Sequence, residues 1–247
     1  MKKVIFHNRN HLKLVGHFWE SDSDSIIIFC HGFTSDKSAR GRFDRLAVFY
    51  HGLGYAVLAF DFSGCGESDD VHLTLANRII DLYAAISYVQ AQGYRRIVLH
   101  GHSLGTCVCL SCYTPVIDTM ILTGALTGPM FYDWEQVYSK QQIQALRREG
   151  YITEVQAKRD VMIDKQMLLD FEQIDQEKLL SHVKCPVLII HGDGDQEERA
   201  LYQNSQRGLK WLPEASKLEV IQGATHSFTY HLSQIEHLAK RWLHFQW

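Results

Sequence analysis

The sequence lacks a long apolar run and any block of charge of one sign. No segment approaches the roughly 18 uninterrupted apolar residues that a membrane-spanning helix requires, so we expect a soluble protein with no membrane partner. Lysine and arginine total 25 against 28 aspartate and glutamate, and both signs are spread along the chain. Without a basic patch, nucleic acid is not expected as a partner either.

An export signal is also missing from the first residues. The two lysines after Met1 are not followed by an apolar stretch of about 7 to 15 residues, so we expect a cytoplasmic protein. The six cysteines then favour reduced thiols over a disulfide framework. Cys107 and Cys109 point about 200° apart on a helix, which disfavours a metal site with the nearby Cys112. We expect buried thiols, and neither a metal nor another cofactor.

The apolar pattern of the chain is that of an α/β protein with a mainly parallel sheet. A chain of 247 residues, 46% of them hydrophobic, is long enough for one substantial core. Short apolar runs alternate with longer amphipathic stretches. The expected strands are 13–20, 25–30, 56–61, 96–100, 118–123, 186–192 and 217–221. The expected helices are 42–53, 74–92, 104–113 and 230–245.

Residues 101–105, GHSLG, have the pattern and context of a nucleophile elbow. They follow an apolar strand and precede a helical stretch. Gly101 and Gly105 leave space for a sharp turn that lifts the hydroxyl of Ser103 above the edge of the sheet. The helix N-terminus behind the serine favours developing negative charge. Ser103 is therefore predicted to be a nucleophile.

A serine hydroxyl needs a base, and the base needs a carboxylate that orients it. Of the 14 histidines, His226 is best placed, because it lies in a short loop between the last expected strand and the last helix. The carboxylate should lie between serine and histidine in the chain. Asp195 follows an expected strand, where open α/β sheets place their functional loops. Asp195 is our choice, Asp193 is better explained as a turn residue, and Glu197 and Glu198 remain alternatives.

A tetrahedral oxyanion needs two preorganised backbone donors. The N–H of Leu104, directly after the predicted nucleophile, is one candidate. The N–H of Phe33, in the segment that follows the strand at 25–30, is the other. His31 in the same segment is expected to organise the loop.

Five separate motifs now occur in a fixed order. They are HGF at 31–33, DFSGCGES at 61–68, GHSLG at 101–105, HGDGD at 191–195 and GATH at 223–226. Through them the chain resembles the α/β-hydrolase superfamily over essentially its whole length, most closely the cinnamoyl (feruloyl) esterase-like and serine-aminopeptidase-like hydrolases. The resemblance implies an eight-stranded, mostly parallel sheet flanked by helices. It also implies a Ser–His–Asp triad, which falls on Ser103, His226 and Asp195.

The resemblance divides the chain into a core and an inserted cap. Residues 1–126 and 183–247 correspond to the core, and 127–182 to a helical cap between the sixth and seventh strands. The inserted stretch has no convincing strand, yet it is too long for a structureless loop. Relatives often have a small residue directly after the second glycine of the elbow, where this chain has Thr106.

These residues predict cleavage of a carboxylic ester in a small-molecule acyl substrate through an acyl-enzyme. The same triad could serve thioester, amide or peptide hydrolysis, or acyl transfer to an alcohol. A non-catalytic ligand-binding protein on the same scaffold is the rival from another class, and a homodimer is left open. Four aromatic residues begin the cap and are candidates to line a pocket for an aromatic or medium-chain acyl group, although core packing explains them as well: Phe131, Tyr132, Trp134 and Tyr138.

Overall fold

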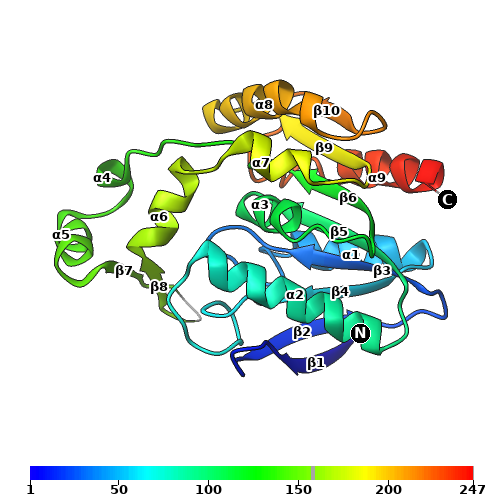
Figure 1. The fold of residues 1–247 in the computed structure, drawn as a ribbon, viewed down its shortest axis with the longest axis horizontal. Coiled ribbons are helices and arrows are strands. Elements are labelled where there is room, and N and C mark those ends of the chain that lie inside the picture. Colours follow the sequence, from blue (N-terminus) through cyan, green and yellow to red (C-terminus); the bar gives the residue numbers. More distant parts are fainter. Residues whose placement is uncertain (157–158, 247) are drawn as a thin grey trace.

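The computed structural model describes residues 1–156 and 159–246, with an eight-stranded sheet at the centre (Figure 1). The strand order is β1-β2-β4-β3-β5-β6-β9-β10. β2 pairs antiparallel with β1 and β4, and the other neighbours are parallel. The strands are β1 Lys2–His7, β2 Lys13–Trp19, β3 Ser25–Cys30, β4 Ala56–Phe60, β5 Arg96–His102, β6 Ile117–Thr123, β9 Val187–Gly192 and β10 Lys217–Ile221. The expected eight-stranded, mostly parallel sheet is confirmed.

The burial of each strand follows its place in the sheet. β3 is central, and all six of its residues are buried, as expected for a parallel strand covered on both faces. β1 lies at the edge and alternates, with Val4 and Phe6 buried between exposed neighbours. The apolar runs in the sequence did not reveal β1, because a half-exposed edge strand has no continuous apolar run.

Helices cover both faces of the sheet, and each face has its own apolar core (Figure 1). α2 and α3 pack on one face, and α1 and α9 on the other. The helices are α1 Arg42–Gly52, α2 Leu75–Ala91, α3 Leu104–Ser111, α8 Gln196–Gly208 and α9 Leu232–Gln246, with a short 3₁₀ turn at Leu209–Trp211. The four expected helices are confirmed, whereas α8 had not been predicted. Over residues 1–156 and 159–246, no helix is both long and apolar enough to cross a membrane.

The segment between β6 and β9 has a mixed structure rather than the expected helical one. Its elements are α4 Trp134–Val137, α5 Lys140–Glu149, β7 Tyr151–Glu154, β8 Val161–Asp164, α6 Lys165–Glu172 and α7 Gln176–Ser181. β7 and β8 form a two-stranded antiparallel sheet, which corrects the expectation that this interval contains no strand. α4 to α6 and the β7–β8 ribbon stand beside the main sheet (Figure 1). α7 instead packs on the main sheet, since Leu180 belongs to the core beneath α2 and α3.

The inserted elements are attached to the main sheet by an apolar cluster at the elbow. Leu104 of α3 and Leu73, just before α2, share this cluster with Met167 and Phe171 of α6. Leu73 also forms an isolated parallel bridge with Ile163 of β8. The insertion is therefore packed directly against the beginning of α3.

Truncation of a central strand should destabilise the protein far more than the same truncation at the edge. Ile28 of β3 is fully buried, and Ile5 of β1 is 54% exposed. Ile28→Ala removes buried methyl groups and leaves a cavity, so we expect the free energy of unfolding to fall by about 2–5 kcal/mol. Ile5→Ala should lower it by less than about 1 kcal/mol. Urea titration followed by circular dichroism measures both, and equal losses would contradict this assignment of the core.

Candidate active site

Ser103 lies in a strained turn between β5 and α3. Its backbone angles are φ 54° and ψ −128°, a combination that residues with a side chain rarely adopt. Two hydrogen bonds hold the turn: the N–H of Ser103 donates to the carbonyl of Thr123 at 3.0 Å, and its carbonyl accepts from the N–H of Thr106 at 2.9 Å. This geometry is that of a nucleophile elbow, as predicted.

The two glycines of the elbow are required by close backbone contacts. A Cβ on Gly105 would lie 2.0 Å from the carbonyl oxygen of Cys30. A Cβ on Gly101 would lie 2.8 Å from Cα of Thr106. Because these neighbours are backbone atoms, they cannot move aside without displacing β3 or the start of α3.

Thr106, which departs from the pattern of the relatives, connects the elbow to the segment that follows β6. Its side chain is fully buried. The hydroxyl donates to the carbonyl of Ser103 at 2.6 Å and accepts from the N–H of Leu126 at 2.8 Å. The larger residue therefore adds two hydrogen bonds at the turn that carries Ser103.

His226 lies beside Ser103, as predicted. Its Nε2 is 2.9 Å from the Ser103 hydroxyl, and its loop connects β10 with α9. Gly124, just after β6, lies against the imidazole, because a Cβ there would be 2.8 Å from Cε1 of His226. The imidazole of His226 therefore fits only because residue 124, which is distant in sequence, is a glycine.

The carboxylate beside the imidazole belongs to Glu198, not Asp195. Oε1 of Glu198 is 2.5 Å from Nδ1 of His226, and the residue is fully buried on α8. Its other oxygen, Oε2, accepts from the N–H of Gly192 at 2.8 Å and lies 3.0 Å from Nδ1 of His191. Both oxygens of the buried charge therefore have hydrogen-bond partners, as a buried carboxylate requires.

Asp195 has a different position from the one predicted. It caps α8, where its Oδ1 accepts from the N–H of Glu198 at 2.8 Å. Its Oδ2 accepts from the backbone N–H of His226 at 2.7 Å. Asp195 thus holds the backbone of both residues, and the structure corrects its assignment as the group that orients the imidazole.

A helix start signal in the sequence could have indicated this arrangement. Asp195 is followed three residues later by Glu198, the spacing of an N-cap and the third helical residue in a capping box. That pattern predicts a helix that begins at residue 196, with the carboxylate of Asp195 capping its N-terminus. Glu198 would then begin the inward face of the helix.

The protonation states follow from burial and from these partners. Burial lowers the pKa of His226, but the hydrogen bond with Glu198 and the nearby carboxylates outweigh it and raise the pKa above the ordinary 6.5. Burial raises the pKa of Glu198, while hydrogen bonds with His191 and His226 bring it down to about 2. An ionised Glu198 accepts from the Nδ1–H of His226. Nε2 is then free to accept the hydroxyl proton of Ser103.

A buried polar chain continues behind Glu198. His191, the last strand residue but one of β9, is fully buried and connects Glu198 to Ser205. Ser205 Oγ lies 2.8 Å from Nε2 of His191 and 3.0 Å from Oγ1 of Thr127. Because the ionised Glu198 can only accept, His191 donates to it from Nδ1. Sequence reasoning assigned no role to His191, although this residue begins the HGDGD motif at the end of a buried strand.

A second histidine packs against the imidazole of His226. The rings of His102 and His226 lie 5.1 Å apart between centroids. Burial lowers the pKa of His102 well below 6.5, and the positive charge of Arg42 lowers it further. The ring is therefore neutral. Arg42 donates to Nε2 of His102 at 3.1 Å and also to the carbonyl of Ser227. The pair supports the loop that carries His226.

The loop expected to provide the second oxyanion donor lies next to Ser103. A Cβ on Gly32 would be 3.2 Å from Cβ of Ser103. Burial lowers the pKa of His31 to about 3, and this neutral ring accepts from the N–H of Phe62 at 3.1 Å and donates to the carbonyl of Gly32 at 3.0 Å. His31 therefore fixes the peptide between Gly32 and Phe33.

The four aromatic residues of the insertion have different surroundings. Phe131 is 75% exposed, and Tyr138 is buried in the apolar cluster at the elbow. Trp134 packs on Tyr132 with ring centroids 5.0 Å apart. The hydroxyl of Tyr132 donates to Oε1 of Glu197 at 2.9 Å, and that oxygen lies 3.9 Å from Nε2 of His226. Tyr132 is thus the member of the group that a polar contact connects, through Glu197, to the surroundings of His226.

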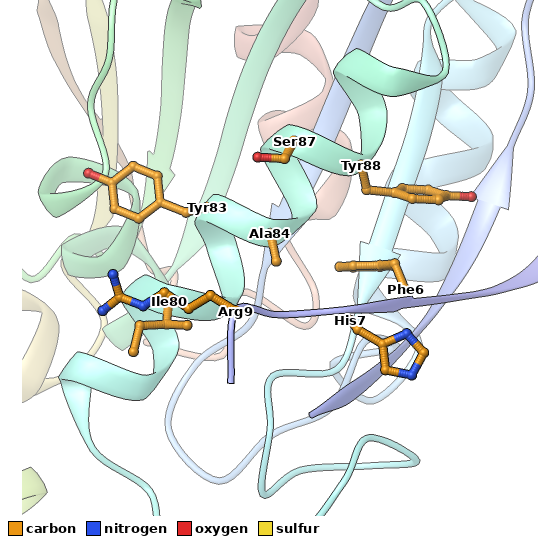
Figure 2. Close-up of a pocket in the computed structure, with 8 residues that line it drawn as sticks. All are labelled: Phe6, His7, Arg9, Ile80, Tyr83, Ala84, Ser87 and Tyr88. Carbon is orange, nitrogen blue, oxygen red and sulfur yellow. The ribbon is translucent and has the colours of Figure 1, made fainter. Parts of the chain in front are cut away.

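A surface pocket of about 480 Å³ lies elsewhere, between β1 and α2 (Figure 2). Its lining includes the stacked rings of Phe6 and Tyr88 together with Arg9 and Tyr83, and none of the residues around Ser103. Within the described ranges, no group of three or more potential ligands is arranged to hold a metal ion. All six cysteines are free and buried.

Comparison with known proteins identifies the family. Residues 27–236 match the family described as the Alpha/beta hydrolase family, so the chain belongs to the alpha/beta hydrolase family. Hydrolase is accordingly the class of enzyme that the assignment supports.

Individual relatives are distant. Uncharacterized protein Rv2307c of Mycobacterium tuberculosis is 26% identical over 239 residues, which cover 92% of this chain and 72% of the relative. Lysophosphatidylserine lipase ABHD12 of Danio rerio is 23% identical over 241 residues, 90% of this chain and 58% of the relative. The structure of Est1E from Butyrivibrio proteoclasticus with ferulic acid bound has a TM-score of 0.78 at 21% identity, covering 98% of this chain and 99% of that one.

The pKa of His226 should depend on Glu198. Glu198→Gln removes the charge that stabilises the imidazolium, so the pKa of His226 should fall, and the neutral form should persist to lower pH. Nuclear magnetic resonance titration of the imidazole nitrogens measures this directly. Glu214→Gln, which removes an exposed carboxylate ahead of β10, is the control. An unchanged titration of His226 in Glu198→Gln would contradict the contact.

Proposed function

We propose that the protein is a serine hydrolase that cleaves carboxylic esters through an acyl-enzyme. The observation that carries the proposal is one chain of hydrogen bonds at a strained elbow. It runs from Ser103 Oγ to His226 Nε2 over 2.9 Å and from His226 Nδ1 to Glu198 over 2.5 Å. Nucleophile, base and carboxylate thus take the relative positions that a catalytic triad needs.

Acylation begins when the Ser103 oxygen attacks the carbonyl carbon of the ester. Nε2 of His226 takes the hydroxyl proton as the new C–O bond forms, and the carbonyl electron pair moves to oxygen. The ionised Glu198 stabilises the imidazolium and keeps Nδ1 protonated. Nε2 then returns the proton to the alcohol oxygen as that C–O bond breaks, which leaves the acyl group on Ser103.

The oxyanion is stabilised by the N–H groups of Leu104 and Phe33 in this proposal. Leu104 is the first residue of α3, so its N–H has no acceptor within the helix. The N–H of Phe33 belongs to the same peptide group as the Gly32 carbonyl, which accepts a hydrogen bond from His31. Both donors are part of fixed backbone next to Ser103, which is the preorganisation that such a site requires.

Deacylation repeats these steps with water in place of the alcohol. His226 removes a proton from water as the water oxygen attacks the acyl carbon. The Ser103 oxygen leaves with that proton, and the carboxylic acid is released. Protein groups supply every proton transfer, so the proposed mechanism requires no metal or organic cofactor.

Aromatic side chains next to the oxyanion loop favour an acyl group with an aromatic or medium-length apolar part. The rings of Phe33 and Phe171 lie 5.4 Å apart, and Tyr132 and Trp134 each pack on Phe171. Two of the similar proteins support this choice of substrate. One relative is named a lipase, and a protein of similar fold binds ferulic acid, an aromatic carboxylic acid. Ester cleavage is therefore proposed ahead of the other acyl-transfer reactions.

A fluorophosphonate probe should label the protein at Ser103. The probe reacts with an activated serine, so wild type should be labelled and Ser103→Ala should not. Ser111→Ala removes a hydroxyl at the other end of α3 and is the matched control. Peptide mass spectrometry locates the label. Equal labelling of Ser103→Ala would contradict the assignment of the nucleophile.

Glu198→Gln should reduce turnover much more than Asp195→Asn. Loss of the charge behind the imidazole should lower kcat by roughly 10³–10⁴-fold. Asn still caps a helix well, so Asp195→Asn should cost less than about tenfold. Initial rates on p-nitrophenyl butyrate, normalised to folded protein, compare the two. The reverse order would return the role of the acid to Asp195.

A further inference from the structure

A second carboxylate stands on the substrate side of His226. Glu198 lies behind the imidazole at Nδ1, whereas Oε1 of Glu197 lies 3.9 Å from Nε2, the nitrogen that also contacts Ser103. The two neighbours on α8 therefore approach opposite nitrogens of the same ring. The Glu197 side chain is 38% exposed, so it is accessible to a bound molecule.

Glu197 is held in place but is not neutralised. The Tyr132 hydroxyl donates to Oε1 at 2.9 Å, and ring contacts with Trp134 and Phe171 fix Tyr132 in turn. In the described part of the chain, the ion pairs of Glu197 include no lysine or arginine, and His226 is the only basic side chain among them. Asp195 and Glu198, the other carboxylates near this ring, already accept hydrogen bonds at both oxygens.

The position of Glu197 determines which part of a substrate it meets. Nε2 of the base donates its proton to the leaving alcohol, so the leaving oxygen must come within hydrogen-bond distance of Nε2. Oε1 of Glu197 is 3.9 Å from the same nitrogen. Substituents on the alcohol, within a few bonds of that oxygen, will therefore lie within a few ångströms of the Glu197 carboxylate.

We propose that Glu197 is a specificity-determining residue that favours esters whose alcohol carries a positive charge and disfavours those with an anionic alcohol. This inference rests on the proposed serine-esterase function and names the substrate class of that same site. A fixed carboxylate attracts a cationic group at short range and repels an anionic one. Tyr132 contributes by orienting the carboxylate toward Nε2.

Three butyrate esters that differ only in the alcohol test the proposal. Butyrylcholine carries a quaternary ammonium, 3,3-dimethylbutyl butyrate replaces that nitrogen with carbon, and 3-sulfopropyl butyrate carries a negative charge. The readout is the ratio of kcat/KM between esters within one variant, which any general loss of activity leaves unchanged. Glu197→Gln keeps the acceptor for Tyr132 but removes the charge, and Glu214→Gln is the control for net charge.

Wild type and Glu214→Gln should prefer butyrylcholine over the neutral ester by about five- to tenfold and disfavour the sulfonate by a similar factor, as for a partly exposed charge. In Glu197→Gln both ratios should approach one. Added salt should reduce the wild-type preference through screening. A ratio near one in wild type, or a preference that survives Glu197→Gln or salt, would overturn the inference while ester hydrolysis stands. Absence of both ester turnover and Ser103 labelling would overturn the proposed function, and the inference with it.

Discussion

The buried carboxylate of Glu198 is the constraint on which the rest of the site depends. An ionised group inside a protein is tolerated only if its oxygens are fully hydrogen bonded. Glu198 meets this requirement with groups from two elements, the end of β9 and the loop after β10. Its partners are consequently held together: His226 is oriented toward Ser103, and His191 is fixed behind the acid. The hydrogen bonds that one buried charge requires thus bring together the groups of the proposed triad.

Close backbone packing places Ser103, the proposed nucleophile, within reach of that histidine. Ser103 has a positive φ and is held by hydrogen bonds through Thr106 and Thr123. The strain is sustained because α3 approaches β3 so closely that only glycine fits at Gly105. The insertion packs on the start of α3 and places Tyr132 on Glu197, next to His226. Elbow, loop and insertion therefore converge at one edge of the sheet.

Much of the fold and part of the site could be predicted from local patterns. Buried parallel strands are continuous apolar runs, so β3 and β9 were recognisable, while the half-exposed β1 was not. Ser103 and His226 were found because each follows a strand in a short turn whose shape depends on local residues. The place of Asp195 relative to the imidazole was not predicted because α8 was not recognised, and the start of that helix decides which carboxylate turns inward. The β7–β8 ribbon was missed because its strands have only four residues each.

The sequence by itself determined the alternation of strands and helices, the elbow around Ser103 and the loop that carries His226. These depend on apolar periodicity and on turn chemistry, which act over a few residues. Only the tertiary structure decided between Asp195 and Glu198, joined His191 to the acid and set Glu197 against Nε2 of His226. Those outcomes depend on distances between elements far apart in the chain. They are fixed by how buried charges find partners once the sheet has formed.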